Sequence, residues 1–196
     1  MSATSTLERT ALKEWAVLCD AMARGDIVAL VRKGGIREQR AGFGVRHDRF
    51  VFYPTFFHER DGELARRFRD TLATSHASQP PAGIVRLSLV ADVAAVWQVR
   101  DLDRLRAIEA DHGLAWEAVE ARFNYRGVPG VSVVAVRAAR FPSPLDVPEA
   151  RRYAGCVSWV ELDEDVDVGG ARPVLDDASF EGRLTRLRSA LGEASA

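Results

Sequence analysis

Residues 27–59 have the sequence IVALVRKGGIREQRAGFGVRHDRFVFYPTFFHE, the chemically densest stretch of the chain. The β-branched residues within 27–32 predict a buried strand, and the glycine pair at 34–35 predicts a tight turn because glycine tolerates positive φ. Residues 50–53 predict another strand, which ends at Pro54 because proline has no amide hydrogen for a sheet ladder. The stretch therefore predicts strands joined by a charged turn, with basic and aromatic side chains along one edge.

The segments outside this stretch alternate between helical and strand patterns. Leu12, Trp15 and Cys19 recur at steps of three and four residues, which predicts an amphipathic helix over 8–24 that ends at Gly25. Comparable patterns predict helices over 59–73, 101–109, 114–123 and 178–191, strands over 84–99, 131–141 and 155–162, an irregular segment with prolines at 142–148, and a linker at 74–83.

The order of these elements predicts the fold class. The strands are not separated one by one by helices, as they would be in a doubly wound parallel sheet. We therefore predict an α+β fold with flanking helices and a mostly antiparallel sheet, for which a barrel-like form is a candidate. We expect one domain over residues 8–192, with a loop division near 74–83.

Composition narrows the classes of protein that the chain could represent. Hydrophobic residues make up 47% and charged residues 28% of the chain, which is ordinary for a globular protein. The only cysteines are Cys19 and Cys156, and they form no CxxC pair. This favours a reducing compartment and argues against a structural zinc site. No apolar run approaches the ~20 residues that cross a bilayer. We expect a cytoplasmic protein with no membrane contact and no bound cofactor.

The charges are unevenly distributed although the formal net charge is only −1. Residues 32–69 contain ten basic and five acidic side chains, and aromatic residues alternate with cations around 50–58. Stacking aromatics beside phosphate-binding cations are typical of sites for single-stranded nucleic acids and flipped bases. The predicted ligand-binding residues are Arg32, Lys33, Arg46, His47, Tyr53, His58, Arg122, Trp159 and Glu161.

We assign these residues separate roles in binding RNA, DNA or a nucleotide-like ligand. Arg32, Lys33 and Arg46 would contact phosphate, Tyr53, His58 and Trp159 would line a pocket for a base, and Arg122 would be a second anion clamp. The site would then combine residues 27–59 with residues 122–125 and 156–161. The competing interpretation is a hairpin with solvated charges and aromatic rings that fill the core.

Two other function classes stay open, and so does the question whether the chain is an enzyme. A metal-dependent nuclease or another hydrolase would use His47, His58 and Glu161, but no D/E-x-K segment and no H-x-x-x-H pair is present. A protein-interaction module would need no site at all. We assign no catalytic and no metal-binding residues, and the oligomeric state is left open.

Five blocks of the sequence resemble a known family. They are ALKEW at 11–15, VRKGGI at 31–36, FYPTFFHE at 52–59, RFNY at 122–125 and YAGCVSWVEL at 153–162. Together they are similar to the uncharacterised bacterial family numbered 1802 among the domains of unknown function, over about residues 9–190. That resemblance implies no activity, and it places the chain in a restriction-modification-like context.

A looser resemblance concerns the fold alone. Residues 21–25, AMARG, and the strand at 27–33 are similar to the first helix and strand of ASCH domains, relatives of the PUA RNA-binding barrels. The resemblance implies a PUA- or ASCH-like barrel core. The ASCH pattern G-x-K-x-x-E-x-R is incomplete, because residues 25–32, GDIVALVR, lack its lysine and glutamate. The active residues of that family are therefore not carried over.

Overall fold

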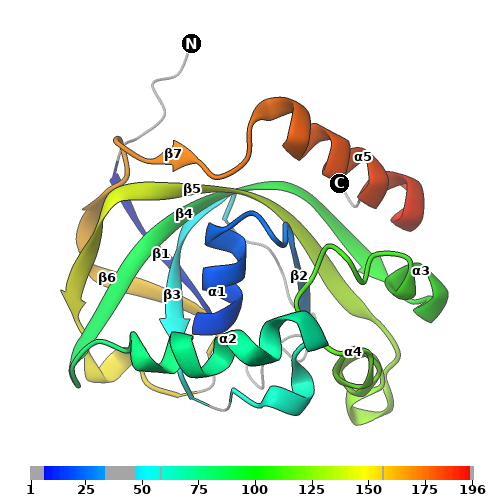
Figure 1. Ribbon diagram of the computed structural model, residues 1–196, viewed down its shortest axis with the longest axis horizontal. Coiled ribbons are helices and arrows are strands. Elements are labelled where there is room, and N and C mark those ends of the chain that lie inside the picture. Colours follow the sequence, from blue (N-terminus) through cyan, green and yellow to red (C-terminus); the bar gives the residue numbers. More distant parts are fainter. Residues whose placement is uncertain (1–6, 34–46, 58, 156, 195–196) are drawn as a thin grey trace.

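A curved sheet organises the molecule (Figure 1). The computed structural model describes residues 7–33, 47–57, 59–155 and 157–194. Within these residues the sheet has seven strands in the order β2-β5-β4-β3-β1-β6, with β7 paired to β5. The strands are β1 Leu7–Trp15, β2 Ala29–Arg32, β3 Arg49–Thr55, β4 Ile84–Val99, β5 Val131–Pro148, β6 Trp159–Asp167 and β7 Arg172–Pro173.

The pairing of the strands confirms the predicted fold class. Only β1 and β3 are parallel, and every other recorded pair is antiparallel. Among the described residues the path runs from β2 to β6 without a ladder between those two strands. The fold is therefore α+β with a mostly antiparallel sheet that is curved but open.

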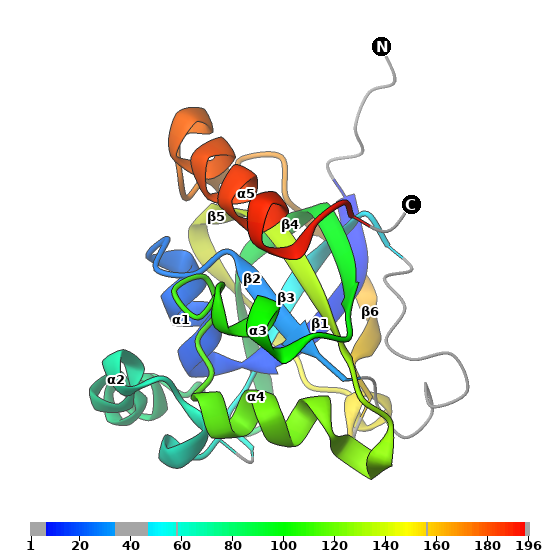
Figure 2. The same ribbon diagram turned by 90° about the vertical axis from the view of Figure 1, so that its right-hand side faces the viewer.

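Five α-helices flank this sheet in the described part of the chain. They are α1 Ala16–Ala23, α2 Arg66–Ala77, α3 Leu102–Arg106, α4 Trp116–Phe123 and α5 Asp177–Leu191, and the short 3₁₀ turns are η1 Asp61–Glu63, η2 Tyr125–Gly127 and η3 Arg151–Tyr153. Helix α1 lies in the hollow of the sheet, and α2 passes below the end of β3 (Figure 1). Figure 2 shows α5 lying across β4 and β5, with α3 and α4 beside β2.

Strands β1 and β3 are buried on both of their faces. Leu12 and Phe52 point into the larger core, which they share with α1 and α5. Ala11 and Tyr53 point the other way, into a second core built from β4, β5 and β6. Because successive side chains of a strand alternate between its faces, neighbouring residues here belong to different cores.

This double burial explains why the helix predicted over 8–24 is wrong in its first half. Residues 7–15 form β1, which pairs with β3 on one side and β6 on the other. Ala11 and Leu12 are both buried, so the strand shows no apolar alternation, and its apolar residues merge with the true periodicity of α1. The predicted end is confirmed, since Gly25 has φ 76° just beyond the helix.

The prolines at 142–148 do not interrupt β5, contrary to the prediction of an irregular segment. Over residues 145–148 the strand pairs with β4, whereas β2 and β7 pair with earlier parts of it. A proline is compatible with a strand whose amide edge faces no partner. The strand predicted over 84–99 is confirmed as β4, and the closing helix is confirmed as α5.

No helix in the described part of the chain has the length and apolar composition that spanning a membrane requires.

Candidate functional site

Arg32, predicted to contact phosphate, lies at the end of β2 and makes its contacts with other residues of the chain. Its Nη1 donates to Oε2 of Glu14 at 3.0 Å and to the carbonyl oxygen of Lys13 at 3.1 Å. The Glu14 side chain is only 6% exposed. The pair therefore joins β2 to β1 across a buried gap, where an unpaired carboxylate would be costly.

Lys33 fastens the end of α4. Its Nζ donates to the carbonyl oxygens of Phe123 at 3.0 Å, Gly130 at 2.6 Å and Val128. The carbonyl groups at a helix C-terminus lack intrahelical partners and carry partial negative charge, so an ammonium group suits them. Burial lowers the pKa of Lys33.

Arg122 reaches the same region from α4. Its Nη1 donates to the carbonyl oxygen of Val31 at 3.0 Å, and its guanidinium carbon lies 5.4 Å from the Trp15 ring centroid. Burial lowers the pKa of Arg122, with Arg32 contributing and Glu14 opposing the shift. The structure thus brings Arg32, Lys33 and Arg122 together, as internal ties among β1, β2 and α4.

His47 and Trp159 form a second group. Their ring centroids are 5.2 Å apart, and the Phe50 ring meets Trp159 edge-on at 5.3 Å. Glu161 is exposed on β6, in register with Thr10.

Arg46, His58 and Cys156 lie outside the described residues, so the roles predicted for Arg46 and His58 stay predictions. Among the residues that the structure describes, no three His, Cys, Asp or Glu side chains are placed to hold a metal ion.

Tyr53 is separated from Trp159 by the sheet itself. Trp159 packs against the core that contains Leu12, whereas Tyr53 belongs to the core that contains Ala11. The described members of the predicted base pocket thus lie on opposite faces of β1 and β3. Only Tyr53 lines the large cleft described next.

That cleft has a volume of about 960 Å³ and lies at the end of β3. Its walls come from α1, residues 53–57, the end of α2 with residues 78–83, the first residues of β4, and residues 149, 154, 155 and 157. The predicted linker therefore forms one wall of the cleft. Figure 1 shows how β3 ends close to both α1 and α2.

The floor of the cleft contains a buried hydroxyl group. Ser75, on α2, is 2% exposed, and its Oγ has no hydrogen-bond partner among the described residues. Such a group costs free energy unless something pairs with it. Nearby Cys19 is buried, and burial raises the pKa of its thiol, which makes it a small apolar side chain and not a nucleophile.

Aromatic side chains line the β3 side of the cleft. Phe57 is 76% exposed, Phe56 is half-buried, and Tyr53 is buried. The Phe56 ring meets the His76 ring edge-on at a centroid distance of 6.0 Å. This side of the cleft therefore offers flat apolar surface next to open solvent.

Charged groups complete the cleft. Lys13 donates its Nζ hydrogens to the carbonyl oxygens of Tyr153 and Gly155 (3.2 Å for Gly155) and lies 5.5 Å from the Tyr53 ring centroid. Arg86 is exposed and forms a bidentate ion pair with Asp146. Cations and aromatic faces thus line the same hollow.

Glu59 holds the frame of the cleft together. Its side chain is fully buried, its Oε1 accepts from the Val17 amide at 3.1 Å, and its Oε2 lies 2.5 Å from Nε2 of His76. Burial raises the pKa of Glu59, although both partners favour its ionised form. One carboxylate therefore joins the start of α1 to the end of α2.

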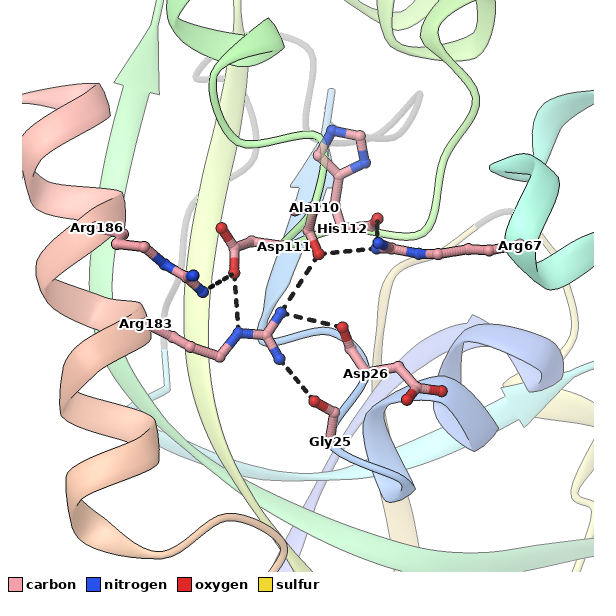
Figure 3. Close-up of polar contacts among 8 residues, drawn as sticks. All are labelled: Gly25, Asp26, Arg67, Ala110, Asp111, His112, Arg183 and Arg186. Atoms are coloured by element: carbon pink, nitrogen blue, oxygen red, sulfur yellow. Dashed lines mark hydrogen bonds and ion pairs between the residues drawn. The ribbon is translucent and has the colours of Figure 1, made fainter.

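A separate polar cluster, drawn in Figure 3, has a structural role. Arg183, on α5, donates to Oδ1 of Asp111 at 2.9 Å and to the carbonyl oxygens of Gly25 at 2.6 Å and Asp26 at 3.0 Å. Arg186 lies 3.5 Å from the same carboxylate oxygen. These contacts attach α5 to the segments around α1 and α3.

Sequence reasoning missed Lys13, Ser75 and Glu149 as cleft residues. Lys13 carried a usable signal, because lysine occurs only at positions 13 and 33 in a chain rich in arginine. Ser75 and Glu149 carried none, since their positions depend on how α2 and β5 meet in space.

Comparisons with known proteins found a family and similar solved structures. Two solved structures, ASCH from Zymomonas mobilis and a serine-to-alanine mutant of the same protein, are similar to the chain with TM-scores of 0.45 and 0.44. Their sequence identities are 14% and 12%, over 91% and 90% of this chain and 94% of each of theirs. A search of curated proteins found no significant match. The family described as Domain of unknown function (DUF1802) matches residues 11–186, and the chain therefore belongs to that family.

Proposed function

We propose that the chain binds a nucleotide, or a single-stranded segment of RNA or DNA, by taking a base into the cleft at the end of β3. A volume of about 960 Å³ is sufficient for a nucleotide, because ligand clefts of ~300–1,000 Å³ bury most of a small ligand. The other function classes considered from the sequence have no comparable structural support among the described residues.

Stacking would supply most of the affinity. Phe56 and Phe57 present rings to the cleft, and every base has a flat face that can stack on them. Because Phe57 is 76% exposed, a base that covered its ring would remove apolar surface from water.

Phosphate would be attracted by Lys13 and Arg86, which line the cleft and also bind carbonyl oxygens and Asp146 respectively. Phosphate contacts by Arg32, Lys33 and Arg46, and an anion clamp at Arg122, stay predictions. The described members of that group bind internal acceptors and do not line the cleft. Substituting them would therefore lower stability as well as any binding.

The observation that carries the proposal is a cleft of about 960 Å³ in which the aromatic residues Phe56 and Phe57 and the cations Lys13 and Arg86 line the same space. Stacking surface beside cations is the combination that single-stranded nucleic acids require.

The test compares two exposed aromatic residues. We expect Phe57→Ala to weaken binding of short single-stranded RNA and DNA, measured by fluorescence anisotropy, by about 1–3 kcal/mol, the usual value of one stacked base. Tyr125→Ala is the matched control, because Tyr125 is 45% exposed on η2 and lies outside the cleft. Melting temperatures of both variants show whether each is folded.

Two results would overturn the proposal. One is the absence of binding to oligonucleotides and to free nucleotides, and the other is an equal loss of affinity in the Phe57 and Tyr125 variants. Recovery of intact labelled oligonucleotide after incubation with Mg²⁺ or Mn²⁺ separates a binding module from a nuclease.

A further inference from the structure

The carboxylate of Glu149 is held at the cleft from two directions. Its backbone amide donates to the carbonyl oxygen of Gly83 at 2.8 Å, which joins β5 to the 78–83 wall. Its Oε1 accepts a hydrogen bond from the hydroxyl group of Tyr53 at 3.0 Å. The side chain is otherwise exposed, so the carboxylate faces the cleft from a defined position.

Tyr53 can hold that position because its own ring is fixed. The ring is 3% exposed and meets Tyr153 edge-on at a centroid distance of 6.1 Å. Lys13 Nζ lies on the ring at 5.5 Å. Burial raises the pKa of Tyr53, and Glu149 raises it further, so the phenol keeps its hydrogen and donates it.

The carboxylate can only accept hydrogen bonds. Two carboxylate oxygens offer about four acceptor positions, and Tyr53 occupies one of them. A ligand that meets this group must therefore bring donors. A ligand that presents a carbonyl oxygen would place two acceptors against each other.

From this geometry we propose that Glu149 makes the cleft selective for bases with an exocyclic amino group, which are adenine, cytosine and guanine, over uracil and thymine. The inference rests on the proposed function and adds the chemical class of the bound base. Amino groups of bases donate well to carboxylates, as in the pairing of Glu or Asp with the cytosine N4 amino group. Uracil and thymine have no amino group, and their one donor on the pairing edge, the N3–H, lies between two carbonyl oxygens that a carboxylate repels.

The experiment measures this preference in the full chain. The probes are an oligouridine and the same oligonucleotide with one central adenosine or cytidine, and a second set uses UMP, AMP and CMP to distinguish free nucleotides from nucleic acid. For the unmodified protein we expect the amino base to tighten binding by about 5- to 100-fold, the range for one good base contact.

Three variants identify the group responsible. Glu149→Gln keeps an acceptor for the Tyr53 hydroxyl but adds an NH₂ donor, so the preference should disappear or turn toward uracil. Tyr53→Phe tests the positioning role and should reduce the preference while the carboxylate remains. Glu181→Gln removes an equal charge at an exposed position of α5, outside the cleft, and should leave the base preference unchanged.

The outcomes separate the inference from the proposed function. Equal affinity of the unmodified protein for all probes overturns the inference alone, as does a Glu149→Gln variant that weakens every probe by the same factor. Absence of all binding overturns the proposed function as well. Melting temperatures of the variants show whether each is folded.

Discussion

His112 is a titratable side chain that lies buried in the described part of the chain. It is 1% exposed, its Nδ1 accepts from the Leu114 amide at 3.2 Å, and its Nε2 has no partner among the described residues. Burial lowers the pKa of His112 from 6.5 to about 4, and Arg67 and Arg122 add to the shift. The imidazole is therefore neutral in the folded protein near neutral pH.

This residue predicts a specific sensitivity to acid. Between pH 6.5 and about 4, His112 is protonated in the unfolded chain but neutral in the folded protein. The free energy of unfolding therefore falls as the pH falls through this window. The loss should reach about 3 kcal/mol, because each pKa unit is worth roughly 1.4 kcal/mol.

His112→Asn provides the comparison, because its side-chain oxygen can still accept from the Leu114 amide but does not titrate. Urea denaturation across this pH range should show a flatter decline for the variant than for the unmodified protein. Parallel pH profiles would contradict the assignment.

At the scale of elements, a single side chain, that of Arg183, attaches α5 to three other residues of the fold. Arg183 spans Asp111, Gly25 and Asp26 (Figure 3), and Asp111 is only 6% exposed on its side chain. We expect Arg183→Met to lower the free energy of unfolding by about 3 kcal/mol, because it leaves a buried carboxylate with only the exposed Arg186, at 3.5 Å.

Arg188→Met serves as the control for this variant, since Arg188 is exposed on the same helix. Asp111→Asn combined with Arg183→Met should recover part of the loss, which a double-mutant cycle by chemical denaturation would measure. Additive losses would mean that Arg183 and Asp111 do not depend on each other.

The elements also show where sequence patterns succeed. Strand β4 was predictable because it is long and rich in valine, and helix α5 because its buried residues recur at helical spacing. Strand β1 was not, because Ala11 and Leu12 are buried in two different cores. The prolines of β5 led to a wrong prediction for a similar reason. Whether a strand tolerates proline depends on which of its edges is paired, and the sequence does not reveal the pairing.

At the scale of the whole molecule, the candidate site could be predicted only in part. Tyr53 and the neighbouring aromatic residues were found, because a dense aromatic block is visible in the sequence. Tyr53 and Trp159 do not line one pocket as predicted, because β1 and β3 lie between them. Which side of a sheet a residue faces depends on register, and a shift by one residue reverses it.

The distribution of charge predicts a weak dependence of binding on salt. The chain has a formal net charge of −1, and Lys13 and Arg86 are the cations that line the cleft. With two phosphates neutralised, log K against log salt should have a slope of about −1.4 for a single strand. A titration of affinity against salt measures this slope, and a much steeper one would indicate a basic face elsewhere.

The position of β1 between β3 and β6 has a consequence for how the chain folds. Leu12 pairs with Phe52 on one side and with Trp159 on the other, so one edge of β1 is completed by a segment far along the chain. Contacts between distant segments require loop closure before they return any stability, which slows folding. During synthesis β1 must therefore wait for β6, and until β6 arrives the open edge of β1 can pair with other chains.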